Sequence, residues 1–426
     1  MRRCIFSTLS GLAFATAALA GEAPLPDFAD ETLSGDWGGR RSAAANRGFL
    51  FEGGIKVDAF RNRGALRNGS KSVSHIDLRL NVDLDKAAGW QGASALLDVV
   101  SDSGWGPNAR LVGAQMGVTN IEVGAPTTTR LFQAWLQQSF FDERLAVLAG
   151  LYPIDSEFFT MDAAGIFLGP QYGTPAELAQ TDTPSVFDNS AFGIRARWNI
   201  APSLYAMGAV LDGVPNDPAH PRRTSIRFAR GDGGFTIGEF GWLPEAANDK
   251  FKGHAKVALG YWAYSIRRPD QLDAANIDAG NISGPARRRR SQGGYLLGER
   301  TLASLGGSDD RYISGFARYS FGDGRSTAIK NTLNLGTHVR GPAASRPDDI
   351  IGLAWSRASL SDNWRKVQAV GGTASSRNED ALEVTYRYRL SPWLAIQPNA
   401  QYIRNPGGVA GTASANLIGV RLELAL

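Results

Sequence analysis

Cysteine is almost absent from this chain, whose 426 residues include only Cys4. Cys4 lies in a segment typical of an export signal, so the mature chain has no cysteine, no disulfide and no thiol nucleophile. The four histidines, His75, His220, His254 and His338, are scattered without the spacing of metal ligands, and GxxxxGK, HExxH and GxSxG motifs are missing. The sequence therefore predicts no cofactor, no metal and no catalytic site.

Long apolar runs are also missing. Beyond the N-terminus, no run of about 18 apolar residues could cross a bilayer as a helix. The apolar segment 5–19 follows the basic start MRR and ends in ALA, which is typical of a secretory signal cleaved before Gly21. We therefore predict a signal peptide over residues 1–20. The alternative is a buried N-terminal helix.

An excess of one charge is missing as well. Without Arg2 and Arg3 of the signal, the 45 basic residues fall to 43 against 41 acidic ones, a net charge near +2. A nucleic-acid binder would show a concentrated basic face, so we expect none. The basic run Arg287 to Arg290 falls in a predicted external loop, where it is solvated or touches anionic lipopolysaccharide.

What the sequence does have is alternation. Between residues 382 and 390, apolar or aromatic positions alternate with polar ones: Leu382, Val384, Tyr386 and Tyr388 against Glu383, Thr385, Arg387 and Arg389. Alternate side chains of a strand point to opposite faces, so this segment predicts a sheet with apolar matter on one side and water on the other. In a soluble sandwich the apolar face turns inward, whereas in a transmembrane barrel it turns to lipid.

Strand number and connection length distinguish these two folds. The alternation, bounded by clusters of Gly, Pro, Asn and Asp, predicts sixteen strands: residues 49–60, 74–85, 91–100, 130–140, 144–152, 190–199, 203–212, 233–242, 252–265, 292–302, 311–321, 327–339, 349–358, 380–390, 393–403 and 414–426. Long and short connections alternate, beginning with a loop at 61–73. We therefore predict an all-β, 16-stranded antiparallel transmembrane outer-membrane barrel over residues 49–426.

The segment before the barrel, residues 21–48, predicts a leader and a short helix from Asp36 to Gly48 at the periplasmic end. Aromatic residues at strand ends are typical of the headgroup level: Trp90, Trp242, Trp393, Tyr386 and Tyr388. Pro398 predicts a bulge or a strand end, because proline removes a ladder donor. The final residue, Leu426, is apolar but not aromatic.

The alternation also predicts which side chains line the lumen. A basic side chain on the lipid face would cost about 2 to 4 kcal/mol at mid-bilayer, so the polar set of each strand must face water. The predicted lumen residues are Glu52, Lys56, Asp58, His75, Asp77, Arg79, Asn81, Asp83, Gln133, Trp135, Gln137, Arg195, Arg197, Asn199, Lys330, Thr332, Asn334, Gln397, Asn399, Gln401, Arg421 and Glu423. In segment 233–242 neither register is clean, so the direction of Glu239 stays open.

A barrel of this size leaves an aqueous channel that something must narrow. Residues 153–189 are long, contain four prolines and lack a strand pattern, so we predict that they fold into the lumen as a constriction loop. The alternative is a mobile surface flap.

A family resemblance follows from motifs spread over the chain: LSGDWGGRRSAAANRG, QAWLQQSFFDERLAVLAGLYPIDSEF, FDNSAFGIRARW, EVTYRYRLSPWLAIQPNAQYIRNPGG and LIGVRLEL. In this order and spacing the chain resembles the carbohydrate-selective porins of the OprB family from about Leu33 onward. The resemblance implies a 16-stranded outer-membrane barrel that passes monosaccharides by facilitated diffusion, without energy or cofactor.

Sugars present hydroxyl edges and weakly apolar faces, so a selective path needs fixed donors and acceptors beside aromatic rings. Arginine offers five donors in a rigid fork. We expect the wall donors to be Arg79, Arg195, Arg197 and Arg387. The acceptors, which would also hold the arginines in place, are Asp77, Asp83 and Glu383. A sugar ring would stack on Trp135, together with Phe158 or Tyr172. Gln133 and Gln137 line the same path, and Asp155 and Glu157 belong to the constriction loop. The alternative for each arginine is a salt bridge that stiffens the wall.

Two other functions stay open. The same arginines would serve a general or anion-preferring porin for small organic acids, because they raise the local anion concentration. An outer-membrane enzyme would need a nucleophile and a base, and no spacing of Ser and His suggests them. The expected partners are small sugars, outer-membrane lipid and lipopolysaccharide, and the barrel is either a monomer or a homotrimer.

Overall fold

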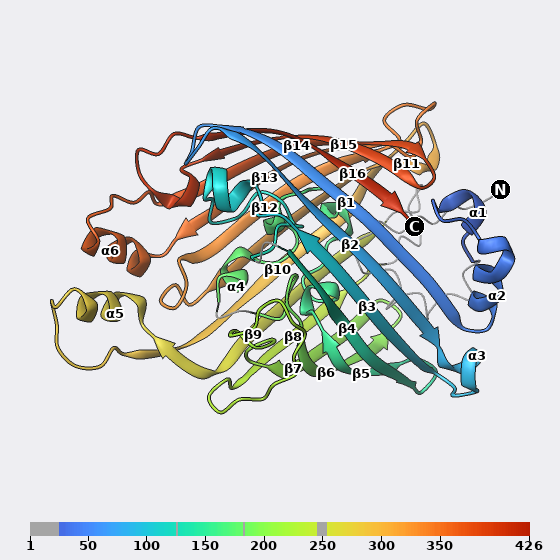
Figure 1. The fold of residues 1–426 in the computed structure, drawn as a ribbon, viewed down its shortest axis with the longest axis horizontal. Coiled ribbons are helices and arrows are strands. Elements are labelled where there is room, and N and C mark those ends of the chain that lie inside the picture. Colours follow the sequence, from blue (N-terminus) through green and yellow to red (C-terminus); the bar gives the residue numbers. More distant parts are fainter. Residues whose placement is uncertain (1–24, 125–126, 182–183, 245–253) are drawn as a thin grey trace.

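The computed structural model describes residues 25–124, 127–181, 184–244 and 254–426, so the predicted signal peptide lies outside the described residues. They form one closed barrel in which each strand pairs with its sequence neighbours and the first pairs with the last (Figure 1). The strands are β1 Phe49–Arg63, β2 Gly69–Asp83, β3 Ala93–Ser103, β4 Thr127–Phe140, β5 Leu145–Tyr152, β6 Ala191–Ala201, β7 Leu204–Asp212, β8 Gly234–Trp242, β9 Ala255–Pro269, β10 Arg288–Leu305, β11 Ser308–Gly322, β12 Ile329–Arg340, β13 Ile350–Leu360, β14 Asn378–Ser391, β15 Leu394–Arg404 and β16 Ala415–Ala425. The predicted 16-stranded antiparallel barrel is confirmed.

The sense of the alternation is that of a membrane barrel. Leu78, Ile194 and Ile418 point outward and are 53%, 55% and 74% exposed, whereas the adjacent Asp77 and Arg195 point inward and are buried. Exposed aromatic residues gather near both strand ends: Phe51, Trp90, Phe140, Trp198, Trp242 and Tyr388 at one end, and Phe192, Tyr261, Tyr319, Phe321 and Tyr402 toward the other. Apolar side chains between two aromatic belts fit a lipid-facing surface.

The N-terminal segment lies at the barrel end that carries the C-terminus (Figure 1). It contains α1 Phe28–Glu31, η2 Trp37–Gly39 and α2 Arg40–Asn46. The α-helix predicted to start near Asp36 begins at Arg40 instead, because Gly38 and Gly39 adopt φ values of 66° and 87° that are not helical. Arg41 ties this segment to the barrel: its guanidinium donates to the carbonyls of Phe51 and Leu426 at 2.6 and 2.8 Å.

Several connections are shorter than the sequence predicts, because strands extend further into the loops. The predicted loop 61–73 shrinks to residues 64–68 between β1 and β2. The run Arg288 to Arg290 belongs to β10 and pairs with Arg267 and Arg268 of β9, so its placement in a loop was wrong. Arg287 remains outside and forms an ion pair with Asp273 at 2.7 Å.

Short helices occupy the other connections: α3 Leu84–Ala88, η3 Asn108–Val112, α5 Gln271–Asp278, α6 Asp362–Val370 and η7 Pro406–Gly408. Helices α5 and α6 contact each other beyond the rim opposite the termini (Figure 1). Among the residues that the structure describes, no helix is long and apolar enough to cross a membrane.

Pro398 lies inside β15 and does not cause a bulge. The register between β14 and β15 is the same on both sides of it, with Thr385 opposite Asn399 and Tyr388 opposite Ile396. Its carbonyl accepts from the Thr385 hydroxyl at 3.2 Å. The predicted bulge or strand end at Pro398 is therefore wrong, since a missing N–H on one residue interrupts the ladder without shifting it.

Candidate functional site

Two loop segments fold into the ring of strands. The first, here called the inserted segment, is residues 153–181 and 184–189, and it contains η4 Ile154–Ser156, η5 Asp162–Ala164, η6 Pro170–Tyr172 and α4 Ala176–Ala179. The second, here called the second insert, is residues 104–124. Both are seen within the barrel outline in Figure 1. Their contacts with the wall determine which inward side chains water can reach.

The inserted segment packs on an apolar half of the wall. The inward side chains of β7 to β11 are mostly apolar there and at most 5% exposed: Met207, Leu211, Phe235, Ile237, Trp262, Leu297 and Phe316. They form one cluster with the segment's own Ile154, Phe158, Phe159, Phe167, Tyr172 and Leu178. Phe159 meets the Tyr295 ring edge-on at 5.7 Å between centroids, and Phe167 lies 5.8 Å from Phe316. This half of the lumen is a packed core.

Carboxylates of the wall hold backbone N–H groups of the segment. Glu239 of β8 accepts from Phe159 at 2.8 Å, and Glu299 of β10 accepts from Ala163 at 2.7 Å. Glu383 of β14 accepts from Leu168 and Gly169 at 2.7 and 3.0 Å. All three are at most 5% exposed. Charged acceptors are well suited to this task, because a bare loop N–H inside the barrel would otherwise lose its hydrogen bond.

Donors of the wall hold carbonyl groups of the segment in the same way. Arg318 of β11 is fully buried and donates to the carbonyls of Gln171, at 2.5 Å, and Gly173. Gln397 of β15 donates to the carbonyl of Ile166 at 2.7 Å, and the Lys256 ammonium of β9 donates to that of Thr160 at 2.8 Å. The inserted segment is thereby joined to strands on opposite sides of the ring.

Arg195 is one of these anchors. Its guanidinium forms an ion pair with Glu157 of the inserted segment and donates to Gln137 at 2.9 Å. Its side chain is 1% exposed. For this arginine the salt-bridge alternative describes the structure, and contact with a passing solute is blocked. Gln137 on β4 takes part in holding it.

The second insert was not anticipated from the sequence, which placed residues 101–129 in an ordinary surface loop. Val112, Met116 and Val118 are buried against β1, β13 and β14 to β16. Thr119 donates to Asp58, which also pairs with Arg421 at 2.7 Å. The apolar run LVGAQMGV at 111–118 was the available signal, since an external loop has no reason to keep it.

The remaining wall, formed by β14 to β16 and β1 to β4, carries charged side chains that stay partly exposed. Glu52 stands directly opposite Arg79, and Lys56 opposite Glu423, across neighbouring strands. Arg79 lies 3.4 Å from carboxylate oxygens of both Asp77 and Asp98, and its side chain is 20% exposed. Arg387 pairs with Glu423 at 2.7 Å and is 21% exposed. Inward-pointing yet accessible groups of both signs mark the aqueous side of the lumen.

Of three other predicted site residues, Trp135 and Arg197 are partly accessible and Gln133 is buried. Trp135 is half-buried, packs against the apolar cluster, and donates from Nε1 to Gln133 at 3.4 Å. Gln133 itself donates to Asp98 at 2.9 Å. The Arg197 guanidinium lies 4.2 Å from the centre of the Tyr205 ring.

Three predicted site residues have other roles. Asp83 is exposed at the end of β2, where its carboxylate accepts from the N–H groups of Asp85 and Lys86 and caps α3. It caps the turn because β2 ends there, so it does not line the lumen. Phe158 and Tyr172 are 0% and 2% exposed, because their rings are covered by the wall they pack against. Neither ring presents a face to a solute.

Two more predicted acidic residues hold the inserted segment. Glu383 anchors it and accepts from Asn399 at 2.7 Å, instead of positioning an arginine as expected. Asp155, in the inserted segment, accepts from the N–H of Phe187 at 2.9 Å and lies 3.4 Å from the Thr174 hydroxyl. Burial raises the pKa of Asp155 to about 6.

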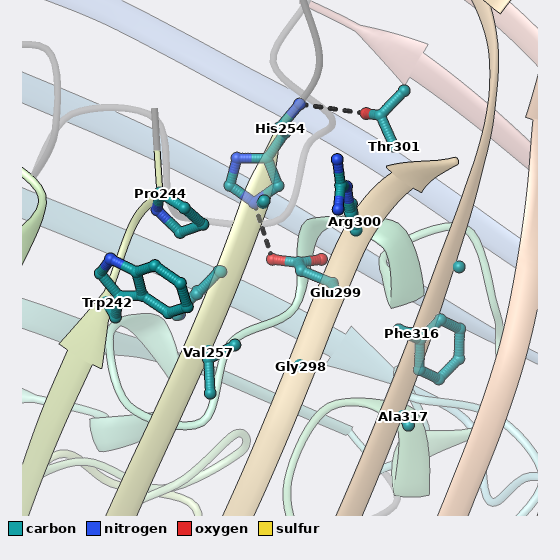
Figure 2. Close-up of a pocket in the computed structure, with 13 residues that line it drawn as sticks. Trp242, Pro244, His254, Val257, Gly298, Glu299, Arg300, Thr301, Phe316 and Ala317 are labelled. Atoms are coloured by element: carbon teal, nitrogen blue, oxygen red, sulfur yellow. Dashed lines mark hydrogen bonds and ion pairs between the residues drawn. The ribbon is translucent and has the colours of Figure 1, made fainter. Parts of the chain in front are cut away.

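A cavity of about 490 Å³ lies at the end of β8 to β11 that is near the chain termini (Figure 2). Its lining combines apolar and charged residues: Trp242, Pro244, His254, Lys256, Glu299 and Phe316. His254 donates from its backbone N–H to Thr301 at 3.0 Å, and its Nε2 lies 2.9 Å from Glu299.

Comparison with known proteins agrees with this geometry. A family model described as the carbohydrate-selective porin, OprB family, matches residues 67–426. The chain belongs to this family. OprB-family proteins are channels of the outer membrane and not enzymes, so the predicted localisation and the absence of catalysis are confirmed.

Individual relatives extend over almost the whole chain. Porin B of Pseudomonas aeruginosa is 26% identical, over 99% of this chain and 96% of that protein. The putative porin QuiX of Acinetobacter baylyi is 24% identical, over 92% of each. The solved high-pH structure of Pseudomonas putida OprB has a TM-score of 0.83 at 22% identity, covering 95% of this chain and all of that one. This structural likeness shows the OprB-type fold.

Proposed function

We propose that this OprB-family porin passes monosaccharides by facilitated diffusion along the wall formed by β14 to β16 and β1 to β4. The observation that supports this most is the set of accessible charges of both signs there, Glu52, Lys56, Arg79 and Arg387, across from a segment fixed inside the barrel. A solute that follows this wall is held close to donors and acceptors for its whole passage.

A sugar suits such a wall because its hydroxyls both donate and accept. Arg79 offers donors from a guanidinium that Asp77 and Asp98 hold in place. Glu52 stands opposite it as an acceptor. Trp135 adds a half-buried ring on the same side, against which an apolar sugar face can lie. Fixed donors and acceptors favour solutes with matching hydroxyls over water-sized or purely apolar ones.

Transport of organic anions is the competing function. A pore tuned for anions should expose mainly basic groups in its passage, because an excess of positive potential attracts them. Here the basic groups have carboxylates beside them, because Asp77 and Asp98 lie 3.4 Å from Arg79, and Glu423 pairs with Arg387 and stands opposite Lys56. These carboxylates offset the positive charge of the wall, which supports a neutral solute.

The test is single-channel conductance of the refolded mature protein in a planar bilayer, titrated separately with three solutes. Glucose should reduce the current saturably. A polyethylene glycol of similar mass, which lacks the hydroxyl array, should reduce it only in proportion to viscosity. Succinate should block weakly. Saturable block by succinate with no effect of glucose would contradict sugar transport and favour the anion pore.

A further inference from the structure

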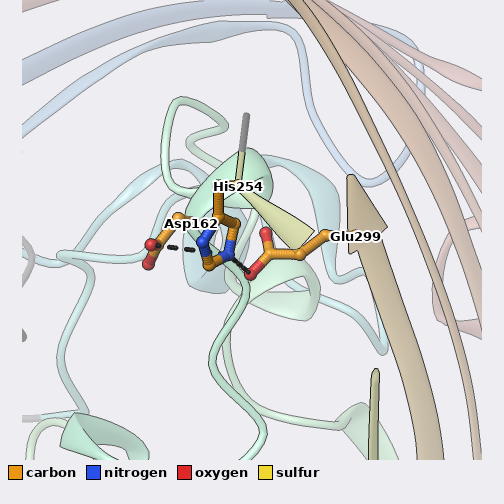
Figure 3. A group of neighbouring side chains, drawn as sticks. All are labelled: Asp162, His254 and Glu299. Carbon is orange, nitrogen blue, oxygen red and sulfur yellow. Dashed lines mark hydrogen bonds and ion pairs between the residues drawn. The ribbon is translucent and has the colours of Figure 1, made fainter. Parts of the chain in front are cut away.

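Three potential metal ligands meet where the inserted segment touches the barrel wall, close to the end that carries the chain termini. They are Asp162 of η5, His254 directly before β9, and Glu299 of β10 (Figure 3). His254 Nε2 lies 2.9 Å from a Glu299 oxygen and 3.9 Å from an Asp162 oxygen, and all three ligand atoms lie within 4.8 Å of one another. Porin transport as described above gives this cluster no role.

The spacing fits a small divalent ion. Zinc binds imidazole nitrogen and carboxylate oxygen at about 2.0 to 2.2 Å, so two ligands of a tetrahedral site are about 3.3 Å apart. The two measured separations of 2.9 and 3.9 Å lie on either side of that value. Small rotations of the Asp162 and His254 side chains, which are 72% and 46% exposed, would equalise them.

The buried ligand is already oriented. One oxygen of Glu299 accepts from the N–H of Ala163 at 2.7 Å, which leaves its other oxygen directed at His254. A hydrogen bond of this kind to a ligating carboxylate fixes its position in metal sites. The exposed sides of Asp162 and His254 give an ion access from water, and the cavity beside His254 and Glu299 adds room there (Figure 2).

Two neighbouring basic side chains oppose a cation, because Lys256 and Arg300 both line the cavity beside the cluster. The Lys256 ammonium is directed to the inserted segment, where it donates to the carbonyl and the hydroxyl of Thr160 at 2.8 and 3.0 Å. The cluster itself, with two carboxylates, is net negative when His254 is neutral. The basic neighbours lower the expected affinity without removing the site.

We propose that Asp162, His254 and Glu299 bind one divalent transition-metal ion, with Zn²⁺ as the probe, and that the ion clamps the inserted segment to β9 and β10. Water completes the coordination. The ion takes the place of a proton on His254 Nε2, so binding releases that proton where the imidazole is charged. The clamp adds a link between the inserted segment and the wall where packing of Ala163 and side-chain hydrogen bonds already hold the segment.

The experiment is a calorimetric titration of the tag-free mature protein with ZnCl₂ at pH 7.5, in a buffer that does not bind zinc. We expect one site per chain, and a loss of affinity of at least about tenfold in His254→Gln and in Asp162→Asn. Asp162 is exposed, so its variant keeps the fold. His220→Gln is the matched control, because His220 is 61% exposed and has Asp217 nearby in a different loop; its affinity should equal that of the unaltered protein.

A second readout separates a clamp from simple ion binding. Zinc should slow hydrogen exchange of the peptide that contains Ala163 in the unaltered protein and leave it unchanged in Asp162→Asn. Zinc affinity that survives in both ligand variants, or the lack of saturable binding at millimolar ZnCl₂, would overturn the proposal. Binding without any slowing of exchange would remove the clamp and leave a metal site alone.

Discussion

The two halves of the lumen wall obey opposite rules. From β14 through β16 to β4 many inward side chains are polar, as Asp77, Arg79 and Gln397 illustrate, and some are open to water. The apolar Phe60 and Leu417 on these strands are covered by the second insert. From β7 to β11 they are largely apolar, as Phe235, Trp262 and Phe316 illustrate, and the inserted segment covers them. The barrel therefore uses the side from β14 to β4 mainly as a polar wall and the side from β7 to β11 mainly as a core.

This difference explains how a wide barrel becomes a narrow channel. An inserted loop must satisfy its backbone groups and bury apolar area to stay in place. The apolar half supplies the apolar surface against which the inserted segment packs. Glu239, Glu299 and Arg318 supply hydrogen bonds to the backbone groups of the segment. Anchors on the polar side, such as Glu383 of β14 and Gln397 of β15, hold the segment as well. The position of the lining therefore depends mainly on β7 to β11, and the accessible polar groups of the other side flank the passage that we propose for the solute.

The largest effect should come from a hole in the apolar half. Phe167→Ala removes a ring that is 2% exposed and packs against Tyr172 and Phe316. Loss of a buried phenylalanine costs about 3 to 5 kcal/mol, so hydrogen exchange of the Leu168 amide, which reports opening of the inserted segment, should accelerate by at least a hundredfold (about 2.7 kcal/mol).

The matched control for this change is Phe240→Ala on the outward face of β8, where the ring is 48% exposed and faces lipid. Its effect on exchange of the Leu168 amide should be close to zero. Equal acceleration in both variants would show that the inserted segment is not held by packing on the inner wall.

A slightly smaller effect should follow from removing a polar anchor. Arg318→Met keeps much of the volume but leaves the carbonyls of Gln171 and Gly173 without their donor. The expected weakening of the docked segment is about 3 kcal/mol. The open-channel conductance should rise and fluctuate, because the segment leaves the lumen for part of the time.

Arg357→Met serves as the comparison for Arg318, since Arg357 pairs with Asp380 at an exposed position of β13. An exposed ion pair contributes about 0 to 1 kcal/mol, so its conductance should match that of the unaltered protein. A steady, unchanged conductance in Arg318→Met would mean that the wall arginine is dispensable for docking.

The sequence predicted the polar half of the wall well and the apolar half poorly. In β2, alternation separates Asp77 and Arg79 from Leu78 and Leu80, because one face meets water and the other lipid. In β8, Phe235 and Ile237 face the inserted segment while Phe240 faces lipid, so both faces are apolar and no register stands out. Alternation of polar and apolar residues reveals a register only when one face of the strand meets water, and neither face of β8 does.

Predicting the site required knowledge of the loops that alternation does not contain. Arg195 and Arg79 look alike in the sequence, each on a polar strand face. Glu157, which lies 38 residues before Arg195, decides that Arg195 is covered. Alternation also does not show where a strand ends. Asp83 continues the alternating polar positions of β2, but β2 ends there and Asp83 caps α3.

A pH dependence should come from the buried carboxyl of the inserted segment. Burial raises the pKa of Asp155 to about 6, from about 3.8 in the released segment. The docked form therefore holds the proton more tightly, so docking is most stable below about pH 4 and weakens as the pH rises through 6. The loss is at most about 3 kcal/mol, and smaller to the extent that water reaches the carboxylate. Asp155→Asn should abolish this dependence in exchange measurements of the Phe187 amide.

The reverse slope, with docking strengthened between pH 4 and 6, would contradict the burial of the Asp155 carboxyl. Thr174→Val provides a comparison, because it removes a hydroxyl close to Asp155 without removing the titrating group. That variant should keep the slope and shift the midpoint upward, since the hydroxyl favours the charged form.

The smallest effect belongs to the polar half. Arg79→Gln keeps a donor but removes the charge from a partly exposed position between Asp77 and Asp98. Loss of one charge-assisted hydrogen bond to a sugar hydroxyl should cost about 1 kcal/mol, which weakens half-maximal block of the current by glucose about fivefold. The docked segment should be unaffected, so exchange of the Leu168 amide should not change.

The control for Arg79 is Arg110→Gln, at an exposed position over Trp105 in the second insert, which should leave both the glucose block and the exchange rate unaltered. If Arg79→Gln accelerated exchange at Leu168 while glucose block stayed intact, the two halves would have exchanged roles, and the division of the lumen into a wall and a core would fail.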